Sequence, residues 1–130
     1  MPKQPLITIV DDDQSVGEAI ANLLRAAGFS ARPYRSAEDF LQSTRLRRTA
    51  CLIVDLRMPG MTGLELHRRL MQSDRPIPTV LITAHADQSV RAQALEAGVV
   101  CYLTKPFHED DLLGCIAQAL AHGKKEEEGP

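Results

Sequence analysis

Apolar and polar positions alternate along the chain in blocks that predict strands and helices in turn. Four continuous apolar runs, rich in β-branched residues, are typical of strands buried on both faces. They cover residues 6–10, 51–54, 79–82 and 99–103. Between these runs, apolar residues recur at helical spacing. They predict helices after Asp13, after Thr62, over about 87–97 and through 113–120.

A fifth segment, residues 30–35, predicts a strand at the edge of the sheet. Its Pro33 has no N–H to donate, and such a proline is confined to edge strands. Ser36, with Asp39 three residues later, is close to a capping box and predicts a short helix. Five β-α units of this size predict an α/β fold, a doubly wound five-stranded parallel sheet with helices on both faces.

Length and composition describe one globular domain. The chain has 130 residues, of which 44% are hydrophobic and 25% charged, and we expect the domain to cover residues 1–123. Residues 124–130 offer no apolar side chain for packing and predict a solvated tail or the start of a linker.

Charge and hydropathy exclude several classes of partner. The formal net charge of -2 gives no bulk attraction to nucleic acid, so contact with DNA would need a separate basic module. No apolar run approaches the roughly 18 residues of a membrane span, and the N-terminus lacks the pattern of a signal peptide. We therefore expect a soluble, cytoplasmic protein without membrane contact.

Three cysteines offer no recognisable redox or zinc motif. Cys51, Cys101 and Cys115 each lie in an apolar run, and none has CxxC spacing. We expect all three to be small buried apolar residues.

Polar residues follow the four apolar strands where each one ends. They are Asp11 and Asp12, Asp55, Thr83 and Lys105. Open α/β sheets bind ligands beyond the carboxyl ends of their strands, which all emerge at one edge of a parallel sheet. The sequence therefore predicts that these residues meet.

The combination of residues indicates phosphoryl chemistry on a carboxylate. Crowded carboxylates require a cation, and Mg²⁺ prefers oxygen ligands such as those of Asp11, Asp12 and Asp55. A Lys and a Thr hydroxyl suit the oxygens of a phosphoryl group. Carboxylates can act as nucleophiles that form acyl phosphates. Asp55 is the favoured nucleophile, because it stands alone at its strand end while Asp11 and Asp12 can share the ion.

Structural roles compete with this interpretation. Acids in the first turn of a helix cap free N–H groups and oppose the helix dipole, and we assign this role to Asp13. Asp55 alone would suit a turn before Pro59 and Gly60. The agreement of four separate strand ends favours a functional site.

With these residues located, the chain resembles the receiver domain of bacterial two-component response regulators, most closely the FixJ-type subgroup. The resemblance covers about residues 5–122 and includes the motifs IVDDD at 9–13, IVDLRMPGMTGLEL at 53–66, LITAHAD at 81–87 and CYLTKPF at 101–107. It implies the flavodoxin-like receiver fold with strand order 2-1-3-4-5.

The resemblance also implies a role for each site residue. Asp55 would be the phosphoacceptor. Mg²⁺ would be bound by Asp12 and Asp55, by Asp11 mainly through water, and by the backbone carbonyl of Arg57. Thr83 and Lys105 would assist catalysis by holding phosphoryl oxygens. A cis peptide bond is implied between Lys105 and the proline that follows it.

Two further features concern switching and phosphoryl lifetime. Tyr102 occupies the switch position of the family, where an aromatic ring moves inward as the Thr83 hydroxyl moves toward the phosphoryl group. The surface that changes would comprise the fourth helix, fifth strand and fifth helix.

Arg57 and His85, each two residues beyond a site residue, flank the path of attacking water, and we expect their bulk to slow self-dephosphorylation.

The resemblance predicts a signalling switch rather than an enzyme with turnover. A sensor histidine kinase, or a small phosphodonor, would supply the phosphoryl group. The altered surface would control dimerisation or an output domain, most simply in transcription regulation, and DNA would be reached only through an output domain absent from this chain. We expect a monomer that dimerises weakly when phosphorylated, and a stand-alone receiver acting by protein contact is the other form.

Two other classes compete with the receiver. A haloacid-dehalogenase-like phosphatase also uses an Asp nucleophile, and Asp11-Asp12-Asp13 contains its DxD pair, but no later strand ends in paired acids and Asp55 would have no role. A flavodoxin-like cofactor carrier lacks its phosphate loop here, and the acids after the first strand would repel a cofactor phosphate.

Overall fold

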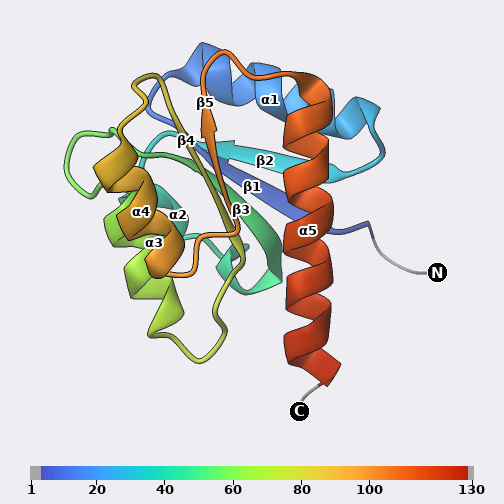
Figure 1. Ribbon diagram of the computed structural model, residues 1–130. Helices are drawn as coiled ribbons and strands as arrows, with labels where there is room; N and C mark the ends of the chain where they lie inside the picture. The colour runs from blue at the N-terminus through green and yellow to red at the C-terminus, as the bar shows by residue number, and fades with distance from the viewer. Residues whose placement is uncertain (1–3, 129–130) are drawn as a thin grey trace.

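The five predicted strands lie side by side in one parallel sheet (Figure 1). The computed structural model describes residues 4–128, with side chains described through residue 121. The strand order is β2-β1-β3-β4-β5, as predicted. The strands are β1 Leu6–Val10, β2 Ser30–Tyr34, β3 Thr49–Asp55, β4 Thr79–Thr83 and β5 Cys101–Thr104. The helices are α1 Gln14–Ala26, α2 Ala37–Leu41, α3 Gly63–Met71, α4 Gln88–Glu96 and α5 Glu109–Glu128, with a 3₁₀ turn at Leu46–Arg48.

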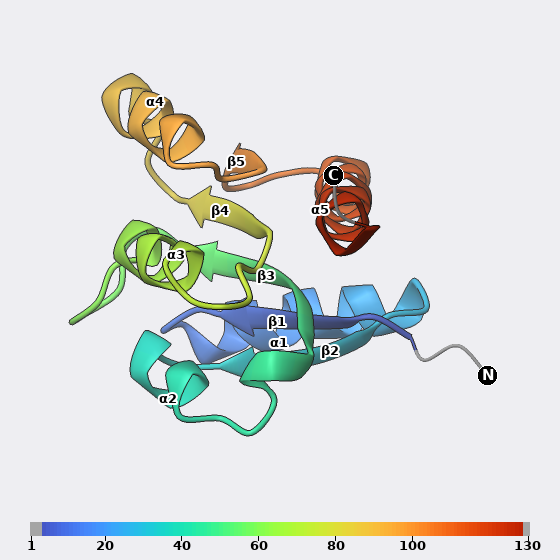
Figure 2. The ribbon, with the colours of Figure 1, turned by 90° about the horizontal axis from the view of Figure 1, so that it is seen from below.

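The sheet has a helical layer on each face. Seen along the sheet in Figure 2, α1 and α5 lie on one side, and α2, α3 and α4 lie on the other. Each face of the sheet carries its own apolar core. Successive residues of a central strand point into opposite cores, as the pleat of a strand requires: Ile53 packs toward α1 and α5, and Val54 toward α2, α3 and α4. The sheet is therefore buried on both faces, as its continuous apolar runs predict.

Pro33 lies in β2, at the edge of the sheet. It stands opposite Ile9 of β1, and β2 pairs with β1 alone within the described residues. The other side of β2 needs no ladder hydrogen bond, so the missing N–H is tolerated there. The prediction of an edge strand is confirmed.

Side-chain caps fix where the helices begin. Asp13 accepts hydrogen bonds from the backbone N–H groups of Ser15 and Val16, as expected for its capping role. Ser36 accepts one from the N–H of Asp39. The start of α3 is capped by a full capping box between Thr62 and Glu65, and α4 is capped by Asp87.

The two helices that flank β5 are anchored very differently. Helix α5 buries Leu112, Ile116 and Ala119 against the sheet, whereas Ala94 is the one buried residue of α4. The end of α4 is held by His67 of α3, whose Nε2 donates to the carbonyl oxygen of Ala97 at 2.8 Å. The other ring nitrogen, Nδ1, lies 2.8 Å from the hydroxyl of Thr79.

The C-terminal segment is more regular than its composition suggests. Helix α5 continues through Glu128, so the backbone of residues 124–128 is helical where a tail was expected. Lys and Glu are good helix formers, and a charged run can extend a helix that is already nucleated. The domain boundary at residue 123 stays a prediction, and residues 129–130 lie outside the described part of the chain. Over the described residues, no helix has both the length and the apolar character to span a membrane.

The cysteines differ from the prediction. Cys51 is a buried free thiol of β3, as expected, but Cys101 and Cys115 are joined in a disulfide. Cys101 is also only half-buried. The prediction was wrong for this pair because β5 and α5 bring the two residues together through packing, which leaves no short motif in the sequence.

Candidate functional site

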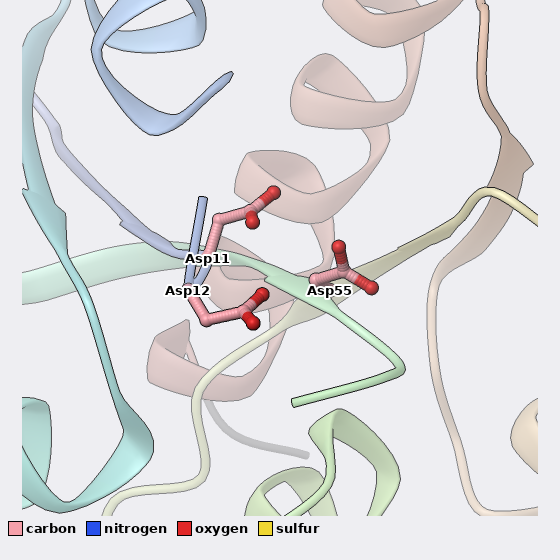
Figure 3. A group of neighbouring side chains, drawn as sticks. All are labelled: Asp11, Asp12 and Asp55. Atoms are coloured by element: carbon pink, nitrogen blue, oxygen red, sulfur yellow. The ribbon is translucent and has the colours of Figure 1, made fainter. Parts of the chain in front are cut away.

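Three aspartates meet beyond the carboxyl ends of β1 and β3. The register pairs Val10 with Val54, so Asp11 and Asp55 come next to each other where these neighbouring strands end. One carboxylate oxygen of each of Asp11, Asp12 and Asp55 lies within 4.8 Å of the others. Figure 3 shows the three carboxylates side by side at this edge. Asp11 and Asp55 are buried, at 1% and 8% exposure, and Asp12 is exposed.

Backbone hydrogen bonds orient the two buried carboxylates. Oδ1 of Asp11 accepts from the N–H of Asp13 at 2.9 Å, and Oδ1 of Asp55 accepts from the N–H of Arg57 at 2.9 Å. Such turns, in which an Asp side chain bonds the backbone two residues on, fix the side-chain direction locally. The second oxygen of each carboxylate remains available for another partner.

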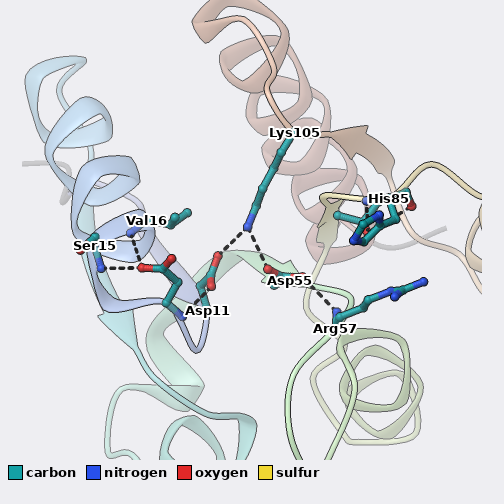
Figure 4. Close-up of polar contacts among 9 residues, drawn as sticks. Asp11, Ser15, Val16, Asp55, Arg57, His85 and Lys105 are labelled. Carbon is teal, nitrogen blue, oxygen red and sulfur yellow. Dashed lines mark hydrogen bonds and ion pairs between the residues drawn. The ribbon is translucent and has the colours of Figure 1, made fainter.

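Lys105 supplies that partner from the loop after β5. Its Nζ donates to Oδ2 of Asp11 at 3.1 Å and to Oδ2 of Asp55 at 2.9 Å (Figure 4). The backbone N–H of Lys105 donates to the carbonyl oxygen of Thr83 at 2.7 Å, which ties this loop to β4. The Lys105–Pro106 bond is cis, as the resemblance implies.

Burial and charge oppose each other at this cluster. Burial raises the pKa of Asp11 above its ordinary value, and the Asp13 hydrogen bond and the Lys105 ammonium offset only part of that rise. Burial alone would lower the pKa of Lys105, but its hydrogen bonds to Asp55 and Asp11 raise it overall. One ammonium is thus paired with two of the three neighbouring carboxylates, which leaves negative charge that a further cation can offset.

Thr83 is buried at the end of β4, and its hydroxyl is engaged within its own loop. Its Oγ1 accepts from the N–H of His85 at 3.2 Å and donates to the carbonyl oxygen of His85 at 3.3 Å. The structure therefore places Thr83 at the predicted strand end without a hydrogen bond to Asp55.

Tyr102 lies in β5 on the side of the sheet that faces α3 and α4. Its half-buried ring packs against the apolar cluster there. Its buried hydroxyl has no hydrogen-bond partner among the described residues. A buried polar group without a partner is unfavourable. Any arrangement that gives this hydroxyl a protein partner or a water molecule therefore stabilises the folded chain.

Arg57 and His85 both lie beside Asp55, on the side of the cluster away from Asp11. Both side chains are exposed, in the loops that follow β3 and β4 (Figure 4). Asp11, Asp12, Asp55, Thr83 and Lys105 therefore lie at one edge of the sheet, with Arg57 and His85 in the loops beside it. Tyr102 lies within β5, three residues before Lys105.

Gly63 supports the site and was missed from the sequence. It opens α3 directly beneath Asp55: a Cβ atom at this position would lie 2.5 Å from the carbonyl oxygen of Asp55. Its N–H donates to the carbonyl oxygen of Leu56 at 3.1 Å. The one sign in the sequence is a glycine immediately after the capping Thr62, where a helix former is more usual.

Comparison with known proteins agrees with this geometry. The family model for the response regulator receiver domain matches residues 7–117. Response regulator protein TmoT of Ectopseudomonas mendocina is 39% identical over 126 residues, which are 97% of this chain and 57% of that protein. Transcriptional regulatory protein FixJ of Rhizobium meliloti is 37% identical over 116 residues, which are 89% of this chain and 57% of that protein.

A solved structure extends the similarity to three dimensions. The response regulator StyR superposes with a TM-score of 0.87 at 42% identity, over 96% of this chain and 63% of that one. The chain spans a little over half the length of the curated relatives TmoT and FixJ.

Proposed function

The chain belongs to the response regulator receiver family, and from this premise we propose that it is a phosphorylation-activated switch of a two-component system with Asp55 as phosphoacceptor. One observation carries the assignment. Asp55 presents a carboxylate that is fixed by the Arg57 N–H, bonded to Lys105 and adjacent to two further acids. The phosphodonor is the phosphohistidine of a sensor histidine kinase or a small acyl phosphate.

The same cluster fits Mg²⁺. The chain offers hard oxygen ligands from Asp11, Asp12 and Asp55, close enough to share one ion. Burial disfavours the charge of Asp11, which a divalent cation relieves. The backbone carbonyl of Arg57 is assigned as a further ligand from the family resemblance alone. When bound, the ion neutralises charge on the phosphoryl oxygens.

The side chains of this site divide the work of phosphoryl transfer. An oxygen of Asp55 forms a bond to phosphorus as the bond from phosphorus to the donor nitrogen breaks. Lys105, already bonded to Asp55, neutralises one phosphoryl oxygen, and the Thr83 hydroxyl donates to another after leaving His85. Positioning and charge neutralisation supply most of the rate in such transfers.

Switching follows from the move of Thr83. As its hydroxyl turns toward the phosphoryl group, it gives up its contacts in the β4–α4 loop, and the ring of Tyr102 shifts inward. The unpaired hydroxyl of Tyr102 supports this assignment. The changed surface comprises α4, β5 and α5, and it controls homodimerisation or an output domain outside this chain. The name of the relative FixJ as a transcriptional regulator supports transcription regulation as the output.

The phosphoryl group on Asp55 is hydrolysed slowly. Arg57 and His85 flank the route of a water molecule to Asp55, and their bulk retards hydrolysis. The chain then acts as a phosphoacceptor and regulator that slowly loses its own phosphoryl group, without repeated catalytic turnover. A cytoplasmic location is part of the same proposal.

Intact mass after incubation with Mg²⁺ and acetyl phosphate tests this function. We expect one phosphate adduct on the parent chain, removed by hydroxylamine as an acyl phosphate should be. Asp55→Asn should give none. Asp13→Asn is the matched control, because Asp13 only caps α1 and Asn caps equally well. Equal adducts on the parent and Asp55→Asn, or no adduct on any chain, would refute the proposal.

A further inference from the structure

Two cysteines face each other between β5 and α5, away from the phosphorylation site. Their Cα atoms are 5.9 Å apart, within the range that a disulfide spans without movement of the backbone. Both side chains pack in the apolar cluster on the α1 and α5 face of the sheet. The packing of α5 against β5 therefore holds Cys101 and Cys115 within disulfide distance.

The two sulfur atoms differ in access to solvent. Cys101 is half-buried on the edge strand β5, and its Sγ lies 3.6 Å from Oε1 of Gln118. Cys115 is 7% exposed. A dissolved oxidant therefore reaches Cys101 first, and Cys115 is placed behind it to complete a disulfide.

Cys51 provides an internal contrast. It lies in the central strand β3 at 0% exposure, and burial raises the pKa of its thiol to about 12. It has no disulfide partner in the described part of the chain. A thiol that is neither accessible nor deprotonated does not react, so only the Cys101 and Cys115 pair is equipped for redox chemistry.

We propose that Cys101 and Cys115 form a reversible dithiol–disulfide switch that locks β5 to α5. The oxidant is a low-molecular-weight disulfide. The Cys101 thiolate attacks one of its sulfur atoms and releases one small thiolate. The Cys115 thiolate then attacks Cys101 Sγ and expels the second. The two electrons given up by the protein thiols reside on the two released thiols, which also take up the two protons.

The disulfide closes a covalent ring around the phosphorylation loop. Residues 101 and 115 are 14 apart in sequence, and Lys105 and the switch residue Tyr102 both lie between them. The bond fixes β5 against α5, two of the three elements of the proposed output surface. This part rests on the proposed function: oxidation opposes any rearrangement of β5 against α5, and phosphorylation opposes oxidation by the same factor.

Alkylation in glutathione redox buffers tests the switch directly. The full chain is equilibrated with mixtures of reduced and oxidised glutathione, quenched with acid, denatured, alkylated with N-ethylmaleimide and weighed intact. Of the three cysteines, all should be alkylated under reducing conditions and only Cys51 under oxidising ones. Dithiothreitol should restore the other two, and peptide mapping should locate the bond between Cys101 and Cys115.

Single variants separate the switch from general oxidation. Cys51→Ser should keep the full transition. Cys101→Ser and Cys115→Ser should each stop at alkylatable thiols or a mixed disulfide with glutathione, and the half-exposed site of Cys101 tolerates Ser even where Cys115→Ser fails to fold. Full alkylation of the parent under oxidising conditions, or linkage between chains on a non-reducing gel, would overturn the proposal.

Coupling to phosphorylation is measured separately. The yield of phosphate adduct from acetyl phosphate should be lower for the oxidised chain than for the reduced one, and equal yields would overturn the coupling. Absence of any adduct in both forms would refute the function proposed for Asp55 and leave the disulfide standing. A normal adduct without a disulfide would refute the switch alone.

Discussion

The contact between Gly63 and Asp55 gives the sharpest test of how the fold supports the site. Replacement of Gly63 by Ala would place a Cβ atom 2.5 Å from the carbonyl oxygen of Asp55, 3.0 Å from its carbonyl carbon and 2.9 Å from Cδ1 of Leu81. The oxygen belongs to the backbone of a central strand and cannot rotate away. The two atoms must therefore move about 0.9 Å apart to reach the 3.4 Å of ordinary contact.

The cost follows from this forced movement. Overpacking of a well-packed interior costs about 1–3 kcal/mol, and the preference of a helix for Ala over Gly returns at most about 1 kcal/mol. We expect Gly63→Ala to lower the free energy of unfolding by about 1–2 kcal/mol. For a domain of this size, that corresponds to a fall in Tm of roughly 4–8 °C.

Gly114→Ala is the matched control. Gly114 lies inside α5, and a Cβ atom there would meet nothing within 4 Å. The same chemical change should therefore raise stability by about 0.5–1 kcal/mol. Urea and thermal unfolding of both variants, followed by circular dichroism, measure the two effects.

Phosphorylation adds a second readout. Displacement of α3 or of the Asp55 backbone should lower the rate of adduct formation from acetyl phosphate at temperatures where Gly63→Ala is still folded, because small misplacements of reacting groups are costly. Gly114→Ala should keep the parent rate. If Gly63→Ala unfolds at or above the midpoint of the parent, the close contact does not constrain the site and the reasoning fails.

Three further predictions concern His67, Asp11 and the disulfide. Burial lowers the pKa of His67, so the unfolded chain binds more protons than the folded chain just below pH 6.5. The free energy of unfolding should therefore rise with pH up to about 6.5 and then level off. Urea titrations at several pH values measure this slope, which should be absent in His67→Gln. In metal-free buffer, Asp11→Asn should unfold at a higher temperature than the parent, because burial raises the pKa of Asp11 and its charge disfavours the folded state at neutral pH. Added Mg²⁺ should stabilise the parent more than the variant, which keeps Asp12 and Asp55 as ligands. The oxidised chain should be about 3 kcal/mol more stable than the reduced one for a ring of this length, and a difference that persists in Cys115→Ser would contradict the assigned bond.

Parallel topology explains why the meeting of the site residues at one edge of the sheet could be predicted. Once buried strands were recognised, the ends of β1, β3, β4 and β5 had to emerge at one edge, so Asp11, Asp55, Thr83 and Lys105 followed from position alone. Hydrogen-bond partners did not follow. The placement of Lys105 between two carboxylates depends on the path of the β5–α5 loop, which no local pattern specifies.

Contacts between distant elements account for the remaining surprises. No role was predicted from the sequence for His67 of α3. Its partners, Thr79 and Ala97, are supplied by a strand and a helix end farther along the chain. The disulfide between Cys101 and Cys115 arises in the same way. Neither pairing leaves a periodic trace, because each depends on how helices pack over the sheet.

The thin attachment of α4 has a consequence for hydrogen exchange. A helix held by buried Ala94 and by the bond from His67 to Ala97 can detach without opening the cores on the two faces of the sheet. Its amide protons should then exchange through local opening at a free energy far below that of global unfolding, while those of α5 around Leu112 and Ile116 report the whole domain. Because so little free energy separates the docked helix from a displaced one, a partner with a modest preference for one position is enough to change which position α4 occupies.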